Sequence, residues 1–213
     1  MSPKDDLEQV LGRSVSRETR ERLSDFEHAL LKWSPKINLV AKTTYPEAWS
    51  RHILDSAQLL PLAPDSIGAW CDLGSGGGLP GLVIAILVAE TTPLARVVLI
   101  ESDARKAAFL TLISSQLGLE TRVLCKRIEE TPSAGADVVS ARALAPLPRL
   151  LGYCHTHLAE TGVALLPKGR TLAQEVEAAR QSWHFDLQTR PSRLDPESAI
   201  LVIRNLRPMD GIR

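Results

Sequence analysis

The sequence predicts an α/β fold in which helices cover both faces of a mostly parallel, seven-stranded sheet. Short apolar runs, each the length of a buried strand, alternate with longer stretches of helical periodicity, which is typical of βαβ units. The run Ala69–Leu73 leads directly into a glycine-rich turn and an apolar helix. The last two β-like runs, Trp183–Thr189 and Ala199–Asn205, are joined by a Pro-containing turn, so a hairpin should complete the sheet with one antiparallel strand.

Composition and charge set limits on the function. The 213 residues are enough for one α/β domain with a small appendage, but not for two large domains. The 25 Lys and Arg balance 25 Asp and Glu, so a nucleic-acid partner would have to be held by local basic patches. The N-terminus is charged, and the longest apolar run, Leu82–Ala89, is too short to cross a bilayer. These features predict a cytoplasmic protein that does not bind a membrane.

The cysteines and histidines do not have the pattern of a metal site. The cysteines are odd in number, widely spaced and set in apolar contexts, which favours reduced core residues over a disulfide framework: Cys71, Cys125 and Cys154. No metal-ligand spacing connects the histidines His155, His157 and His184 with other candidate ligands. We therefore expect no bound metal.

The first sixty residues predict a helical cap. Ser2 suits the start of a helix that ends before Gly12. A second helix should cover Ser16–Trp33, because its apolar residues recur at steps of three and four until Ser34–Pro35 breaks the pattern. We expect both helices to pack on the sheet.

The next segment, residues 36–56, contains more polar groups than a scaffold needs. Pro46 can open a helix on which Arg51 and Asp55 lie one turn apart. The plain interpretation of Arg51, His52 and Asp55 is a solvated helix face with an ion pair, and Asn38 could be a turn residue. The alternative is that these four residues face a ligand.

The glycine-rich turn after Ala69–Leu73 suits a nucleotide cofactor. Gly74, Gly76 and Gly78 permit positive φ and have no Cβ, so a ligand can lie against bare backbone. A dinucleotide turn, G-x-G-x-x-G, would start at the strand end, but Leu79 stands where its last glycine belongs. The stretch D-L-G-S-G-G-G instead resembles the cofactor loop of S-adenosylmethionine-dependent methyltransferases. A nicotinamide or flavin cofactor, and a turn without any ligand, remain as alternatives.

Two further strand ends supply candidates for the same cofactor. The buried run Arg96–Glu101 ends in a carboxylate that can accept hydrogen bonds from both ribose hydroxyls, although Glu101 could also begin a helix cap. A helix should follow over residues 103–117. After the third run, Arg122–Cys125, Ile128 and Glu129 lie where methyltransferases usually hold adenine between an apolar side chain and a polar backbone contact.

Two basic residues follow the remaining parallel strands. Arg142 lies just past the run Asp137–Ser140, and Lys168 lies just past the run Val163–Leu166. Apolar periodicity predicts helices over residues 146–159 and 171–181. Because ligands bind along the carboxyl edge of open parallel sheets, Arg142 and Lys168 should both lie at the ligand edge.

Several stretches together are similar to one known family. The chain resembles the bacterial small-subunit ribosomal RNA guanine-N7 methyltransferase G family, also called glucose-inhibited division protein B. The shared stretches are R-H-I-L-D-S at 51–56, D-L-G-S-G-G-G-L-P-G at 72–81 and A-R-A-L-A-P-L at 141–147, with K-I-N-L, L-I-E-S, R-I-E-E and K-G in smaller pieces. Ser34 and Ala141 depart from the usual pattern, at positions without an assigned chemical role. The resemblance covers roughly residues 30–169.

The resemblance implies a Rossmann-like class I S-adenosylmethionine-dependent methyltransferase that modifies guanine N7 in 16S ribosomal RNA. Residues 63–213 would form the methyltransferase domain, and residues 1–62 would form a helical cap and substrate-facing segment within one compact unit. The family's cofactor contacts correspond to Gly74, Leu79, Ile128, Glu129 and Arg142, beside Gly76, Gly78 and Glu101 from the analysis above. The basic residues of the catalytic site would be Arg127, Arg142 and Lys168. The partner would be 16S ribosomal RNA or the small-subunit ribonucleoprotein, and we expect a monomer.

Guanine N7 has an in-plane lone pair and no proton, so it can attack a sulfonium methyl group without a general base. The usual Arg fork onto O6 and N7 would occupy that lone pair, so specificity should come from acceptors facing the N1–H and N2–H edge. We hypothesise that Asp55 or a loop carbonyl is this acceptor, with Asn38, Arg51 and His52 lining the pocket. The rival interpretations are a methyltransferase acting on a small molecule or a protein, and a non-catalytic RNA-binding protein.

Overall fold

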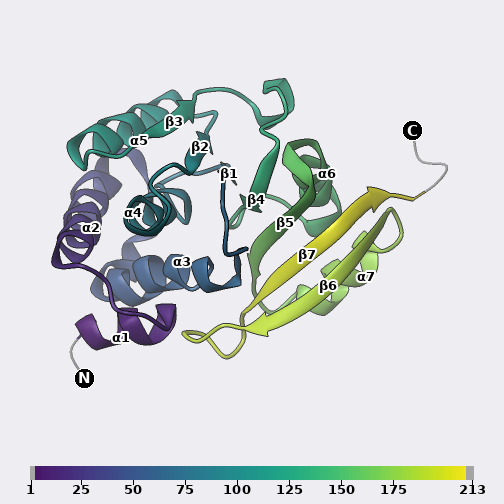
Figure 1. The fold of residues 1–213 in the computed structure, drawn as a ribbon, viewed down its shortest axis with the longest axis horizontal. Helices are drawn as coiled ribbons and strands as arrows, with labels where there is room; N and C mark the ends of the chain where they lie inside the picture. The colour runs from purple at the N-terminus through teal and green to yellow at the C-terminus, as the bar shows by residue number, and fades with distance from the viewer. Residues whose placement is uncertain (1–2, 210–213) are drawn as a thin grey trace.

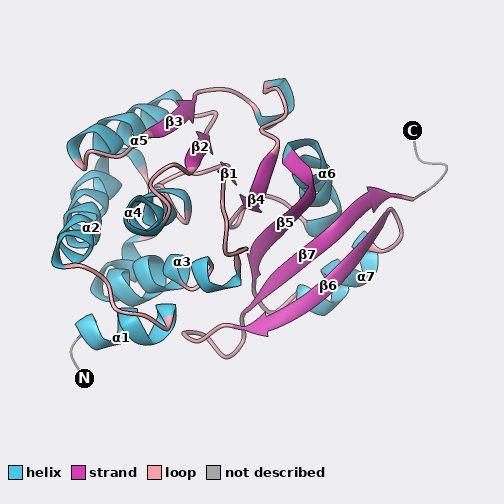
Figure 2. Ribbon diagram, viewed as in Figure 1, coloured by secondary structure: helices cyan, strands magenta, loops and turns pink. Residues whose placement is uncertain are grey.

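The computed structural model describes residues 3–209, so the expected helix cap at Ser2 lies outside the described part. Seven strands form one sheet in the order β3-β2-β1-β4-β5-β7-β6 (Figure 1; Figure 2). β7 is antiparallel to both of its neighbours, whereas the other neighbouring strands are parallel. The predicted sheet and its single antiparallel strand are confirmed. The strands are β1 (Ala69–Leu73), β2 (Arg96–Ile100), β3 (Thr121–Leu124), β4 (Ala136–Ser140), β5 (Leu158–Lys168), β6 (Trp183–Pro191) and β7 (Ala199–Pro208).

Alternate residues of the strands are buried in two separate cores. The covering helices are α4 (Gly81–Thr91), α5 (Ala104–Gln116), α6 (Leu147–His157) and α7 (Leu172–Ala179). Trp70 and Leu99 pack into the core that contains α4 and α5, whereas Cys71 and Leu73 pack into the core that contains α6 and part of α7. Because β1 is buried on both faces, its residues are apolar on both faces except for Asp72.

The N-terminal helices form an outer layer, with α2 on α4 and α5 (Figure 1). They are α1 (Pro3–Leu11) and α2 (Arg17–Ile37). Because α4 and α5 themselves cover the sheet, the cap does not lie directly on it as expected. The predicted end of the second helix at Ser34–Pro35 is also wrong. Pro35 lies in the last turn, where its missing N–H removes only one intrahelical bond, and the helix ends at Asn38 in the left-handed conformation with φ 51°.

The helical winding of the chain between α2 and β1 changes three times, the last time to a short 3₁₀ helix (η3, Leu60–Leu62). A 3₁₀ helix (η1, Lys42–Glu47) is followed by a π-helix (η2, Trp49–Leu54) and by a short α-helix (α3, Asp55–Ala57). In a π-helix the backbone bonds run from i to i+5, so side chains four apart no longer lie above one another. The expected ion pair between Arg51 and Asp55 is therefore not formed. Arg51 Nη1 instead lies 3.7 Å from Glu47 Oε2, and Asp55 Oδ2 lies 3.3 Å from Arg142 Nη1.

A buried hydrogen-bond chain fixes both ends of the glycine turn. Trp70 Nε1 donates to Ser140 Oγ over 2.9 Å, and Ser140 Oγ donates to Asp72 Oδ1 over 2.6 Å. The backbone N–H of Gly81 donates to the other carboxylate oxygen of Asp72 over 3.2 Å. The carboxylate thus ties β1 to β4 and to the first residue of α4. Asp72 is fully buried, and this burial raises its pKa to about 6, although the hydrogen bonds act to lower it.

We predict that Asp72→Asn changes how stability depends on pH. The folded-state pKa is raised, so the protonated carboxyl stabilises the fold below about pH 4, and this contribution disappears as pH rises through about 6. The difference in free energy of unfolding, variant minus wild type, should therefore increase by about 2–3 kcal/mol from pH 4 to pH 7. Urea denaturation across this range measures the difference. Asp65→Asn, at an exposed position, is the control, and a constant difference for Asp72→Asn would contradict the prediction.

Candidate functional site

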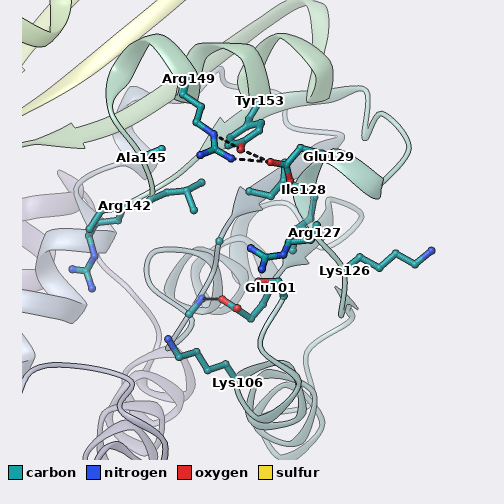
Figure 3. Close-up of a pocket in the computed structure, with 16 residues that line it drawn as sticks. Glu101, Lys106, Lys126, Arg127, Ile128, Glu129, Arg142, Ala145, Arg149 and Tyr153 are labelled. Carbon is teal, nitrogen blue, oxygen red and sulfur yellow. Dashed lines mark hydrogen bonds and ion pairs between the residues drawn. The ribbon is translucent and has the colours of Figure 1, made fainter.

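A cavity of about 340 Å³ opens at the carboxyl edge of the sheet, beside the glycine turn (Figure 3). It extends from that turn past the tip of β2 to the turn after β3, and α6 closes its far side. Seven of the residues predicted to form the site line it: Gly74, Gly76, Glu101, Arg127, Ile128, Glu129 and Arg142.

The glycine turn presents bare backbone to this cavity. Gly74 and Gly76 have φ of 66° and 55°. A Cβ on Gly76 would have no neighbour closer than 3.7 Å, whereas one on Gly74 would lie 2.6 Å from the Leu144 side chain. Of these two glycines, Gly74 is therefore covered by a side chain and Gly76 is not. Gly78 and Leu79 are not among the residues that line the cavity, and Leu79 is buried in the core. Their contact with a cofactor stays a prediction.

The carboxylate of Glu101 is held in place at the tip of β2. It accepts a hydrogen bond from the backbone N–H of Gly76 over 2.8 Å and another from that of Asp103 over 2.7 Å. Glu101 is only 8% exposed and lines the cavity. A carboxylate oxygen has two lone pairs, so each oxygen retains acceptor capacity toward the cavity. Asp103 is the N-cap of α5, and its N–H is bonded to Glu101, so Glu101 also takes part in the start of this helix, as the alternative interpretation expected.

The far end of the cavity is closed by contacts between a turn and α6. The turn is a 3₁₀ helix (η4, Ile128–Glu130). The Glu129 carboxylate accepts hydrogen bonds from Tyr153 Oη and from Arg149, the latter over 3.2 Å, and the three side chains point toward one another in Figure 3. The acidic side chain is therefore engaged with α6, while Ile128 lines the cavity. Sequence analysis missed Arg149 and Tyr153, whose only signal is their spacing of four on one helix.

Arg142 joins the β4 end of this cavity to the cap. Its Nη1 lies 3.3 Å from Asp55 Oδ2 and 3.3 Å from the carbonyl oxygen of Arg51, and its Nη2 lies 3.4 Å from His52 Nδ1. In Figure 3 its guanidinium points away from the end of the cavity that Glu129 closes. The three substrate-facing residues predicted at positions 51, 52 and 55 are thus brought together around one arginine from the other half of the chain.

The hydrogen bonds around His52 define its tautomer. Thr44 Oγ1 donates to the carbonyl of Ala41 over 2.7 Å, so it must accept from His52 Nε2–H, 2.8 Å away. His52 Nδ1 is then the acceptor facing Arg142. Burial, followed by the positive charges of Arg142 and Arg51, lowers the pKa of His52 to about 4. The imidazole is neutral at pH 7 and holds the guanidinium without adding a charge.

Two larger cavities, of about 720 and 660 Å³, lie on either side of the Asp55–Arg142 pair. Asp55, Arg142 and Ser198 line both of them. The first cavity shares the loop residues 142–145 with the 340 Å³ cavity and is also lined by Pro146, Pro167 and Lys168. We call it the loop cavity. The second is bounded by the segment 44–55 and by the turn between β6 and β7.

The two remaining predicted residues have internal partners. Lys168 Nζ donates to Glu175 over 2.7 Å and to the carbonyl of Ala145 over 3.2 Å, and it lines the loop cavity. Asn38 forms the C-cap of α2, a position that its left-handed backbone explains, and it is not among the residues that line the three cavities. The roles predicted for Lys168 in catalysis and for Asn38 in substrate binding stay predictions.

Comparison with known proteins agrees with this arrangement. A family model described as rRNA small subunit methyltransferase G (GidB) matches residues 19–195. A ribosomal RNA small subunit methyltransferase G from Ruegeria sp. TM1040 is 50% identical over 192 residues, which are 90% of this chain and 93% of the relative. One of the same description from Paracoccus denitrificans is 49% identical, covering 91% of this chain and 98% of the relative.

Solved structures with low sequence identity share the fold. A SAM-dependent methyltransferase from Aquifex aeolicus superposes with a TM-score of 0.58 at 12% identity, over 76% of this chain and 94% of its own. A TehB-like SAM-dependent methyltransferase from Corynebacterium glutamicum gives 0.57 at 15% identity, over 85% and 98%.

The strand order, the glycine turn and the acid at the second strand tip define the class of protein, a Rossmann-like class I methyltransferase. Within this class the chain belongs to the rRNA small subunit methyltransferase G family, because the family model covers most of its length and its curated relatives are about half identical.

Among residues 3–209, no cluster of three or more His, Cys, Asp or Glu is placed to hold a metal ion. The helices in the same range are all too short or too polar to cross a membrane.

We predict that the His52 imidazole stays neutral well below neutral pH. In a histidine-labelled NMR titration, its ring signals should not shift between pH 7.5 and about 5, and its midpoint should lie near 4. Arg142→Ala should raise the midpoint, because the variant removes a facing positive charge, although burial should still keep it below the ordinary value. The ring signals of His52 are assigned as those that disappear from the spectrum of the His52→Gln variant. A midpoint above pH 6 in the wild type would contradict the hydrogen-bond arrangement described here.

Proposed function

We propose that this chain transfers a methyl group from S-adenosyl-L-methionine to N7 of a guanine in 16S ribosomal RNA, and that the residues at the carboxyl edge of β1, β2 and β4 bind both reactants. The observation that carries this proposal is the position of the loop cavity. It shares residues 142–145 with the cavity beside the glycine turn, so a base and a cofactor can lie on the two sides of one loop. Family membership supports the reaction.

The residues around the 340 Å³ cavity fit the cofactor. Backbone free of Cβ atoms at Gly76 would accept its amino-acid part, and Glu101 would accept the ribose hydroxyls. Ile128 and the backbone of the turn η4 would hold the adenine. When bound, S-adenosylmethionine supplies a methyl group that a neutral lone pair can accept.

Guanine N7 is such a lone pair and has no proton to lose. The site therefore needs positioning rather than a general base, and positioning alone can supply on the order of 7 kcal/mol. Arg142 suits this chemistry because three acceptors from the cap already hold its guanidinium. A fork onto O6 and N7 through its two terminal nitrogens would have to break these bonds. The nucleophilic lone pair is thus left available.

Asp55 would read the opposite edge of the guanine. Each of its carboxylate oxygens has one donor, Gln58 on Oδ1 and Arg142 on Oδ2, so acceptor capacity remains for N1–H and N2–H. Burial raises the pKa of Asp55, while Arg142 and Gln58 act in the other direction. The Arg142 charge thus favours the ionised form that the reading requires.

The RNA backbone would meet local positive charge, since the whole chain is neutral. Lys126 and Arg127 are exposed at the mouth of the cofactor cavity, and Lys106 lines the same opening. Such groups can bind phosphates from a splayed-out loop, which is the usual form of a recognised guanine in RNA. A cytoplasmic monomer acting on the RNA or on the small-subunit ribonucleoprotein fits this proposal.

Glu101→Gln should weaken cofactor binding about tenfold or more, because a neutral amide replaces an ionised acceptor. The amide oxygen can also satisfy only one of the two backbone N–H groups that Glu101 now holds. Calorimetry with S-adenosylmethionine measures the dissociation constant. Glu120→Gln, at an exposed turn, is the matched control, and thermal unfolding checks that both variants are folded. Equal affinity in the wild type and Glu101→Gln would remove Glu101 from the cofactor site.

The reaction itself is tested in cells. Mass mapping of 16S ribosomal RNA should show one guanine that has a 7-methyl group when this chain is present and lacks it when the gene is deleted. Re-expression of the wild type should restore the modification, and Glu101→Gln should restore less of it. If the RNA maps are identical with and without the chain, the proposed substrate is wrong.

A further inference from the structure

Gln58 is a buried amide whose hydrogen bonds connect two distant parts of the chain. It is 5% exposed and directly follows α3. Its Nε2 donates to Asp55 Oδ1 over 2.8 Å and to Ser192 Oγ over 3.2 Å. Its Oε1 accepts from the backbone N–H of Arg193 over 3.1 Å. Both ends of the amide are thus engaged, one with the substrate-facing carboxylate and the other with the turn between β6 and β7.

The chemistry of these partners fixes the orientation of the amide. The backbone N–H of Arg193 can only donate, so it must face the amide oxygen, and the Asp55 carboxylate can only accept when ionised, so it must face the NH₂ group. A flipped amide would place its oxygen against the Asp55 carboxylate, acceptor against acceptor, and its NH₂ group against the Arg193 N–H, donor against donor. The Gln58 side chain is therefore locked, and it locks one oxygen of Asp55 in turn.

The turn on the other side of Gln58 is itself well ordered by internal hydrogen bonds. Ser192 Oγ accepts from the backbone N–H groups of Leu194 and Asp195, at 3.2 and 3.3 Å. The Ser192 N–H donates to the carbonyl of Ser198 over 2.9 Å. Ser198 lines both cavities beside Asp55. Gln58 thus fixes the β6–β7 turn, which borders both cavities, relative to Asp55.

We propose that Gln58 is a positioning residue for RNA recognition: it orients the Asp55 carboxylate toward the guanine and fixes the β6–β7 turn beside it. This inference rests on the proposed function, in which Asp55 accepts hydrogen bonds from the base. Arg142 holds only one oxygen of Asp55, over 3.3 Å, so without Gln58 the carboxylate could rotate about its last bond. Gln58 itself does not line any of the three cavities described above, so it acts through Asp55 rather than by touching RNA.

Two substitutions separate the contact of Gln58 with Asp55 from one of its two contacts with the turn. Gln58→Glu keeps an oxygen for the Arg193 N–H but places a carboxylate against Asp55. Ser192→Ala removes one bond from Gln58 to the turn, together with the two bonds that Ser192 Oγ accepts within the turn, and leaves the contact with Asp55 intact. We expect Gln58→Glu to raise the KM for RNA about tenfold, with little change in kcat or in the dissociation constant for S-adenosylmethionine. Ser192→Ala should have a much smaller effect on KM.

The pH dependence of Gln58→Glu gives a readout that a purely structural role would not produce. Two adjacent carboxyls share a proton more readily than one, and the shared proton would restore a donor to Asp55. The KM defect should therefore shrink as pH falls from 8 to 6. The charged groups that act on Asp55 are Arg142 and, more weakly, Asp195, and all variants retain both. In an Asp55→Asn background, Gln58→Glu should cause no further rise in KM.

The assays use the full chain, small-subunit ribosomal RNA or its particle, and labelled S-adenosylmethionine, with thermal unfolding as a folding check. If Gln58→Glu does not fold, Gln58→Met tests the same loss of the donor at similar side-chain length. A defective Asp55→Asn beside a normal Gln58→Glu or Gln58→Met overturns this inference and leaves the proposed function standing. A normal Asp55→Asn overturns the assignment of Asp55 and this inference with it, while Glu101→Gln still tests the cofactor site. Equal defects in Gln58→Glu and Ser192→Ala, together with lost cofactor binding, would show that Gln58 is only structural.

Discussion

The arrangement of the site depends on the ion pair between Arg142 and Asp55. It connects the loop after β4 to the cap, two regions 87 residues apart, and the two larger cavities lie on either side of it. Each side chain is 22% exposed, so the pair is only partly screened by water. Removing one partner would leave the other partly buried and uncompensated, which is costly. The pair therefore constrains where the cap lies relative to the sheet edge, and with it the width of both cavities.

The neighbours of this pair are mostly neutral or already paired, which suits a reaction that moves no proton. His52 is held neutral by burial and by its two arginine neighbours, Lys168 is paired with Glu175, and Arg51 is paired with Glu47. A free base near guanine N7 would have no function, and a free arginine could occupy the nucleophilic lone pair. In the proposed function the site would present shape, backbone and one carboxylate to the base.

The sequence was most informative where one residue type is physically required. The glycine turn, the strand before it and the acid at Glu101 were predicted because bare backbone and a strand-end carboxylate have few substitutes. The contacts that assemble the site were not predictable in the same way. Asp55 pairs with Arg142 rather than Arg51 because the π-helix shifts the side-chain spacing. No local sequence pattern indicates a π-helix at this position. Pro35 predicts a helix end, but a proline in the last turn removes only one intrahelical bond, and α2 continues to Ile37.

Gln58 illustrates why long-range polar contacts escape sequence analysis even when they decide geometry. A glutamine among apolar residues has no motif, and its partners in the β6–β7 turn lie 134 and 135 positions away. Only the fold shows that its amide has no freedom, since each end faces a group that can play one role. The same argument applies to Ser140, whose hydroxyl accepts from Trp70 and donates to Asp72 beneath the glycine turn. In both places a neutral side chain with a forced hydrogen-bond direction orients a carboxylate, one beneath the cofactor cavity and one facing the proposed guanine. Both carboxylates are thus oriented by buried polar groups that a motif search does not distinguish from core residues.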